Sequence, residues 1–191
     1  RCLLMSVLLR PERPAQERAC LSLAAAVAAA AAIKQVAGVE ARTKWPNDLL
    51  LDGVKVGGVL LEATSEAVAV GIGINVSGPA VELQARVDRP LTTIEEAAGQ
   101  VVRREDLLVE LLRSLDELYA AFVKNGPAPI VETYRPLDVA LGKRVVVEAP
   151  EGQITGLAVE IDELGHLVVE DEDGNAHTLM AGEVALTEVE E

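Results

Sequence analysis

The chain has 191 residues, of which 50% are hydrophobic, so it can bury a full core, and a disordered chain is excluded. The 31 acidic residues outnumber the 17 basic residues and give a formal net charge of −14. Such a chain lacks the basic face that nucleic-acid binding requires, and aromatic residues (2%) are too few for base stacking. Two cysteines and two histidines supply no disulfide framework and no His-based metal site, so the simplest location is a reducing cytoplasm.

The first segment, residues 2–9, is strand-like and ends in a Pro-containing loop. No secretory leader pattern precedes it, and we interpret Arg1 as lying in the middle of a domain. Eight of the nine positions at 24–32 are alanine, which predicts a helix over 15–37 that ends at Gly38. Its apolar stretch, 19–33, is too short for a membrane span, so we expect the helix to pack closely on a sheet.

A β-rich block follows, with extended chain at 39–44. Asp52-Gly53 lies between two apolar runs, and this dipeptide is typical of a type I′ hairpin turn. The next strand is expected over 54–64, with a turn at 65–66 and a return over 67–76.

Helices are predicted over 92–98, where Thr92 or Thr93 is the N-cap, and over 104–124, where leucines recur at helical spacing. Five short strands then follow, which favours a small barrel or sandwich. They are expected at 144–148, 154–161, 167–170, 176–180 and 184–186. The acidic run 170–173 lacks the ligand pattern of a calcium loop and is interpreted as a solvated turn.

The strand at 67–76 has one nearly bare face. Side chains alternate along a strand, so Ala69, Gly71, Gly73 and Asn75 share one face and the apolar residues between them share the other. A bare face allows a flat ligand to lie on the backbone, but it equally suits a barrel bend or a close helix contact.

The neighbouring strand adds a cation to a second bare patch. Lys55 and Gly57 are expected on one face, followed by Gly58, and the ammonium could hold a carboxylate or a phosphate. A solvated strand lysine is the alternative. The preceding segment, 43–48, either forms an Asx turn at its Asn and Asp or places a carboxylate where it orients an amine or holds a metal–nucleotide unit. Neither a Rossmann fingerprint nor a P-loop is present.

Three motifs in this order resemble the bacterial biotin protein ligases. They are K-W-P-N-D at 44–48, K-V-G-G-V-L-L-E at 55–62 and G-I-G-I-N-V at 71–76. The resemblance covers nearly all of the chain and implies an α+β fold, in which a mixed sheet backed by helices, as in class II synthetases, precedes an SH3-like barrel. The implied domains are residues 1–136, the later part of the catalytic domain, and residues 137–191, the barrel.

The resemblance implies a two-step reaction. The carboxylate of biotin attacks the α-phosphate of Mg²⁺-bound ATP, and a lysine of a biotin carboxyl carrier domain then attacks the biotinyl-5′-adenylate. Lys55 would contact the biotin carboxylate and the adenylate linkage, and Asp48 would orient the acceptor lysine. Gly58, Gly71 and Gly73 would border the biotin rings. The remaining implied ligand contacts are Gly57, Trp45, Asn47 and, for adenine, Asn75. No protein-held metal is expected.

Family members carry a Ser/Thr-Asn segment and a G-R-G-R-x-G-R loop before the region matched here. Their position before Arg1 predicts that these 191 residues alone attach biotin weakly or not at all. We assign the chain no role as a DNA-binding repressor. A lipoate or octanoyl transferase, and a non-catalytic truncated paralogue acting as a binding or assembly module, are the alternatives. Neither a membrane nor a nucleic-acid partner is expected, and the sequence does not decide whether the protein forms a homodimer.

Overall fold

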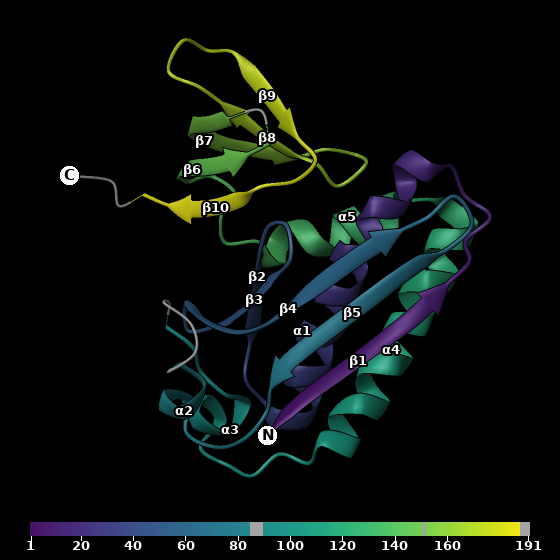
Figure 1. Ribbon diagram of the computed structural model, residues 1–191, viewed down its shortest axis with the longest axis vertical. Helices are drawn as coiled ribbons and strands as arrows, with labels where there is room; N and C mark the ends of the chain where they lie inside the picture. Colours follow the sequence, from purple (N-terminus) through teal and green to yellow (C-terminus); the bar gives the residue numbers. More distant parts are fainter. Residues whose placement is uncertain (85–89, 151, 188–191) are drawn as a thin grey trace.

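The amino-terminal part of the chain forms a five-stranded sheet in the order β1-β5-β4-β3-β2 (Figure 1). This computed structural model describes residues 1–84, 90–150 and 152–187. The strands are β1 (Cys2–Leu9), β2 (Ala41–Lys44), β3 (Asp48–Leu51), β4 (Val54–Ala63) and β5 (Val68–Asn75). All neighbouring pairs are antiparallel, so the expectation of a mixed sheet is wrong for these strands. Tight connections explain the antiparallel pairs β2–β3, β3–β4 and β4–β5, because parallel neighbours need long crossovers.

The turns that fix this sheet follow from local sequence. Asp52 and Gly53 have φ values of 49° and 79°, the positive pair that a type I′ turn requires, which confirms the predicted hairpin. At the next turn the Thr64 hydroxyl accepts hydrogen bonds from the N–H groups of Glu66 and Ala67. The register of β4 and β5 is therefore set at the end of the hairpin far from the glycines.

Helices cover one face of this sheet. The alanine-rich helix α1 (Leu21–Ala37) continues from the 3₁₀ turn η1 (Ala15–Cys20) and ends at Gly38, whose φ is 73°. With α4 (Arg104–Asn125) it lies behind the sheet in Figure 1. By length and composition the helical stretch 15–37 could cross a membrane, but most of it is buried against the protein. Alanine lets α1 approach its neighbours closely, which supports its interpretation as a core helix.

Short helices complete this half of the molecule. The predicted helix α3 (Ile94–Ala98) is capped by the Thr93 side chain, which accepts from the Glu96 N–H at 3.2 Å. Three other elements were not predicted from the sequence: α2 (Ala80–Gln84), α5 (Ala128–Tyr134) and the 3₁₀ turn η2 (Arg135–Leu137). Proline in the first turn of α5 is compatible with a helix, although prolines in this segment argue against one at first reading.

The carboxyl-terminal strands form a second five-stranded antiparallel sheet, in the order β10-β6-β7-β8-β9. They are β6 (Arg144–Ala149), β7 (Gly152–Ile161), β8 (Leu167–Glu170), β9 (Ala176–Leu179) and β10 (Glu183–Leu186), close to the predicted segments. Within the described residues no pairing joins β9 to β10, so the expected barrel is not closed. The acidic run forms a turn, in which the Asp171 carboxylate accepts from the Asn175 N–H at 2.9 Å and contacts the His177 ring.

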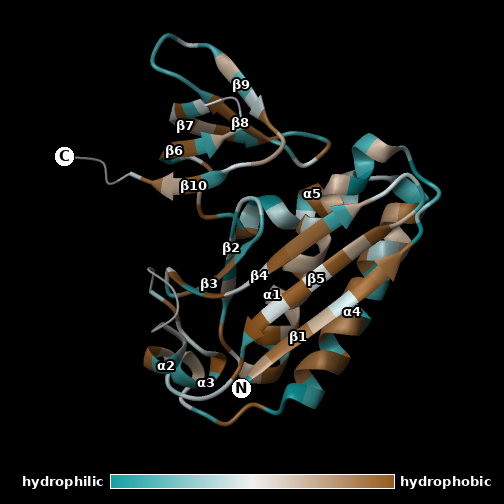
Figure 2. Ribbon diagram, viewed as in Figure 1, coloured by the Kyte–Doolittle hydropathy of each residue, from teal (hydrophilic) through white to brown (hydrophobic). Residues whose placement is uncertain are grey.

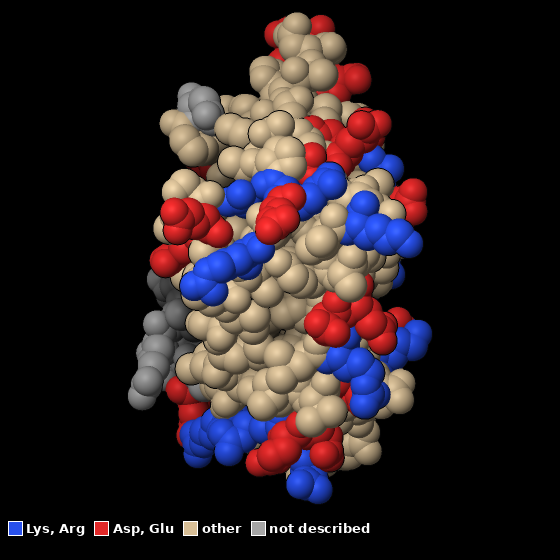
Figure 3. All heavy atoms as spheres, turned by 90° about the vertical axis from the view of Figure 1, so that its right-hand side faces the viewer, with Lys and Arg blue, Asp and Glu red and all other residues tan. Residues whose placement is uncertain are grey.

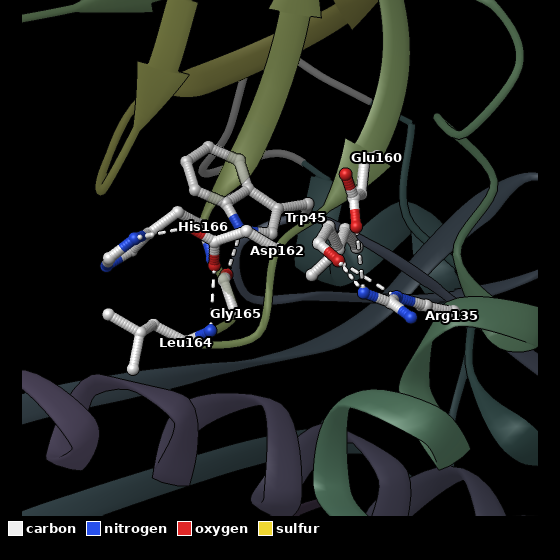
Figure 4. A network of polar contacts seen from close by, with 8 residues as sticks. Trp45, Arg135, Glu160, Asp162, Leu164, Gly165 and His166 are labelled. Atoms are coloured by element: carbon white, nitrogen blue, oxygen red, sulfur yellow. Dashed lines mark hydrogen bonds and ion pairs between the residues drawn. The ribbon is translucent and has the colours of Figure 1, made fainter. Parts of the chain in front are cut away.

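A polar network joins the two sheets (Figure 4). The indole Nε1 of Trp45 donates to the Gly165 carbonyl at 3.0 Å, and Arg135 Nε donates to the Ile161 carbonyl at 2.8 Å. The Asp162 carboxylate accepts from the His166 N–H and shapes the loop that carries Gly165. On the face shown in Figure 3, basic side chains are interspersed with acidic ones.

Candidate active site

The bare strand face predicted from the sequence lies opposite the helices. The four apolar residues of β5 are buried: Val68, Val70, Ile72 and Ile74. Glycines take the other face, and Figure 2 shows β5 alternating between hydrophobic and pale residues. Across the sheet Asp48 pairs with Gly58, and Gly58 pairs with Gly73. Two glycines therefore lie side by side next to a carboxylate.

A cleft of about 550 Å³ opens over these glycines. It brings together six of the residues predicted for the site: Asn47, Asp48, Lys55, Gly58, Gly71 and Gly73. Leu4 and Leu60 form apolar walls, and the side chain of Leu4 partly covers Gly73. A cleft with an apolar wall, a flat backbone floor and polar groups at one end suits a small ligand that ends in a charged group.

Two ammonium groups lie beside the Asp48 carboxylate, and of these only that of Lys55 lines the 550 Å³ cleft. Lys55 Nζ donates to Asp48 Oδ1, and Lys44 Nζ lies 3.5 Å from Asp48 Oδ2. Lys44 also donates to the Val184 carbonyl of β10 at 2.9 Å. The cluster lies where the 550 Å³ cleft meets a second cleft of about 300 Å³ beside β10. The Lys55 ammonium, which lines both clefts, suits an anionic ligand.

Gly57 does not lie on the cleft, contrary to the prediction that it shares a face with Lys55. The pairing of β3 with β4 shifts register, so that Leu49 opposes Gly57 while Leu50 opposes Lys55. This bulge inserts one extra residue and brings Gly58 to the face that Lys55 occupies. A Cβ at position 57 would collide with the Gly73 carbonyl, so Gly57 is required for close strand approach.

Trp45 and Asn75 also lie outside the 550 Å³ cleft. The Trp45 side chain is 1% exposed and is held in the junction between the sheets, so its position is structural. Asn75 ends β5, and its amide donates to the Thr92 carbonyl at 3.2 Å. It lies beyond Gly73 along the strand, and its contact with adenine stays a prediction.

Asp138 is a buried residue that holds the backbone beside the site, and it was not predicted from the sequence. Its carboxylate accepts from the N–H groups of Trp45, Ala140 and Leu141 at 2.8, 2.9 and 3.1 Å, and from the Tyr134 hydroxyl at 3.2 Å. Burial raises the pKa of Asp138, while these hydrogen bonds lower it. Burial, and next the charge of Asp138, raise the pKa of Tyr134 well above its ordinary value. No local signal marks Asp138, because its partner Trp45 is 93 residues away.

Lys44 was quoted in the motif but was not predicted as a site residue. Its position directly opposite Asp48 across the β2–β3 turn could have indicated the ion pair, since cross-strand partners lie close together. Among the described residues, no group of three or more His, Cys, Asp or Glu side chains could hold a metal ion.

Two parts of the chain match known protein families. Residues 1–78 match the Biotin/lipoate A/B protein ligase family, and residues 140–187 match the Biotin protein ligase C terminal domain. The chain is 31% identical over 175 residues to the Bifunctional ligase/repressor BirA of Bacillus subtilis (strain 168), an alignment covering 89% of the chain. It spans only about half (54%) of that relative's length.

Other relatives are covered more fully. The Biotin--[acetyl-CoA-carboxylase] ligase of Paracoccus denitrificans is 34% identical over 175 residues, which cover 86% of this chain and 72% of the relative. The crystal structure of the biotin protein ligase from Aquifex aeolicus superposes with a TM-score of 0.85 at 28% identity, over 97% of this chain and 82% of that one. Its complex with biotin and ATP gives a TM-score of 0.80, over 97% and 78% of the two chains. The chain belongs to the biotin protein ligase family.

Proposed function

We propose that this chain attaches biotin, through biotinyl-5′-AMP, to a lysine of a biotin carboxyl carrier domain. The observation that carries the proposal is the glycine-floored cleft with the Lys55–Asp48 pair at its charged end. A flat bicyclic ligand fits a backbone floor, and its carboxylate matches the Lys55 ammonium. Biotin and ATP are both bound in the Aquifex aeolicus relative named above.

In the first step, a carboxylate oxygen of biotin attacks the α-phosphorus of ATP, and pyrophosphate leaves. Lys55 would neutralise the negative charge that gathers on the carboxylate and phosphate oxygens, which lowers the barrier most where water is excluded. Mg²⁺ would arrive with the nucleotide and screen the phosphate charges. The glycine floor would hold the ring system so that the two reacting groups meet in one orientation.

In the second step, the amine of the acceptor lysine attacks the acyl carbon, and AMP leaves. Asp48 would orient that amine and accept its proton, because its carboxylate lies at the meeting point of the two clefts. Asn47 would line the same junction. Contacts of Asn75 with adenine belong to this proposal as well.

The wider context of this function is proposed from the same family membership. We place the catalytic unit at residues 1–136 and an SH3-like unit at residues 137–191, in a cytoplasmic protein. We do not assign an oligomeric state, and the molar mass of the protein in solution decides between a monomer and a homodimer. Among the described residues, two cations line these clefts. Lys55 lines both clefts, Lys44 lines only the smaller one, and both lysines contact Asp48. We therefore expect slow adenylation by the 191-residue chain.

Biotin-dependent exchange of pyrophosphate into ATP tests the proposal. The 191-residue chain should give slow exchange that biotin stimulates and lipoate does not. Exchange driven by lipoate or octanoate would instead assign a lipoate-type transferase. A folded chain that binds neither biotin nor its adenylate would overturn the proposal and favour a binding module, to be identified by hetero-oligomer formation.

A further inference from the structure

Asp48 is shared by two lysines that differ in what they can do. Lys55 contacts one carboxylate oxygen, and Lys44 lies 3.5 Å from the other. The Asp48 side chain is only 9% exposed, while those of Lys44 and Lys55 are 19% and 27% exposed. A carboxylate this buried is strongly disfavoured without a cation, so one of the two lysines must stay with it.

Position separates the two lysines. Lys44 is the direct cross-strand partner of Asp48, and its ammonium is tied to β10 through the Val184 carbonyl at 2.9 Å. It lines the smaller cleft beside β10 but not the 550 Å³ cleft. Lys55 lines both clefts. Of these two lysines, only Lys55 can reach a ligand in the larger cleft without leaving its strand position.

An anion that enters the larger cleft competes with Asp48 for Lys55. If Lys55 turned to the anion and nothing replaced it, Asp48 would repel the incoming charge and lose its own counter-ion. Lys44 is already beside Asp48 and is held there by a backbone carbonyl, so it can take over without a rearrangement of the chain.

We propose that Lys44 is a positioning residue that keeps Asp48 neutralised while Lys55 moves to the anionic group of the ligand. The second sheet takes part through the Val184 carbonyl, which holds the Lys44 ammonium in place. The identity of the anion as the biotin carboxylate rests on the proposed function. The exchange of partners between Lys55 and Lys44 rests on the geometry alone.

A purely mechanical role is the competing explanation, in which Lys44 only ties β2 to β10. Both explanations predict that Lys44→Met weakens ligand binding. They differ once Asp48 is neutral, because a lysine that acts through the charge of Asp48 then has nothing left to balance. A mechanical tie to Val184 would matter equally in either background.

Calorimetric titration with biotin of the wild-type chain, K44M, D48N and K44M/D48N separates the two roles. We expect K44M to weaken biotin binding about 10-fold in the wild-type background and less than about 2-fold in the D48N background. K44R, which keeps the charge, should bind within about 3-fold of wild type. Equal losses in both backgrounds, or a loss in K44R as large as in K44M, would overturn the proposal.

Lys34→Met is the matched control for the loss of one positive charge, because Lys34 pairs with Glu40 on the surface, at 64% exposure. It should leave biotin binding unchanged. A loss comparable to that of K44M would mean that bulk charge, and not the place of Lys44, determines binding, and this too would overturn the proposal.

A cycle without ligand tests the partner exchange independently of the proposed function. If Lys44 takes over when Lys55 is removed, K55M and K44M should each lower the Tm slightly, and K44M/K55M should lower it by about 2–4 °C more than their sum. Additive losses would refute the exchange. Absence of biotin binding by the wild-type chain would contradict the proposed function, and this unfolding cycle would still decide the role of Lys44.

Discussion

The backbone N–H of Trp45 donates a 2.8 Å hydrogen bond to the carboxylate of Asp138. The same carboxylate accepts from the N–H groups of Ala140 and Leu141, where the chain enters the second sheet. One buried side chain therefore fixes both the turn that leads to Asp48 and the start of the carboxyl-terminal sheet. Its removal should affect the whole molecule.

Asp138→Ala should lower the free energy of unfolding by about 2–4 kcal/mol, because three backbone donors and the Tyr134 hydroxyl lose their acceptor in a buried place. Asp138→Asn keeps the size and one acceptor oxygen, so it should cost less than the alanine variant. Urea unfolding followed by circular dichroism measures both. Equal stability of Asp138→Ala and wild type would show that water replaces these bonds.

Gly71→Ala should fold normally and bind biotin about 10-fold or more weakly. A Cβ at position 71 meets its nearest atom, the Leu60 carbonyl oxygen, at 3.6 Å, which is an ordinary contact, but the methyl group occupies the floor of the cleft. Thermal unfolding and calorimetric titration with biotin measure the two effects. Undiminished affinity would place the ligand away from this floor.

Gly57→Ala is the matched comparison and should behave in the opposite way. Its Cβ would collide with the Gly73 carbonyl at the paired strands, so the variant should lose stability through a forced shift of the β4–β5 pairing. The same thermal scan measures this loss. A Gly57→Ala chain as stable as Gly71→Ala would contradict the close approach of β4 to β5 at Gly57.

Lys55→Ala should slow the adenylation step by about 100-fold or more while the chain stays folded. The physical reason is that no other described cation lines the larger cleft, whereas Lys44 remains to neutralise Asp48 for folding. Biotin-dependent pyrophosphate exchange measures the rate, and circular dichroism measures the fold. Unchanged first-step kinetics would remove Lys55 from the mechanism.

The buried thiol of Cys20 should make the protein less stable at alkaline pH. Burial, and next the charge of Glu17, raise the pKa of Cys20 from 9.0 to about 12, although Arg13 opposes this. The folded thiol thus stays protonated where the unfolded thiol ionises, so its contribution is intact below pH 9 and is lost as the pH rises toward 12.

Urea unfolding at neutral pH and near pH 10.5 should therefore show a loss of up to about 2 kcal/mol in the wild type that Cys20→Ala does not share. All other titrating groups are common to the two chains, so the difference isolates this thiol. A parallel decline of both chains with pH would disprove the assignment.

Local sequence was sufficient for the features that depend on a few neighbouring residues. The positive φ values at Gly38, Asp52 and Gly53 and the Thr93 cap were predictable, because each follows from the backbone freedom or the side-chain hydrogen bonding of a single residue. The alternation in β5 was predictable as well, since it depends on a period of two.

Features set by pairing between distant segments were not predictable in this way. The bulge that turns Gly57 away from the cleft arises where β4 pairs with β3, and nothing within β4 signals it. The acceptor role of Asp138 depends on a partner 93 residues earlier in the chain. Lys44 acquires its second contact only because β10 returns beside β2. Each requires the tertiary fold before it can be seen.

The chain has a single tryptophan, Trp45, and its indole donates a hydrogen bond to the Gly165 carbonyl at the junction between the two sheets. The intrinsic tryptophan fluorescence of this protein therefore reports on the solvent exposure of that junction. A red-shifted emission spectrum would show that the two sheets have separated, even if the cleft over the glycines stayed intact.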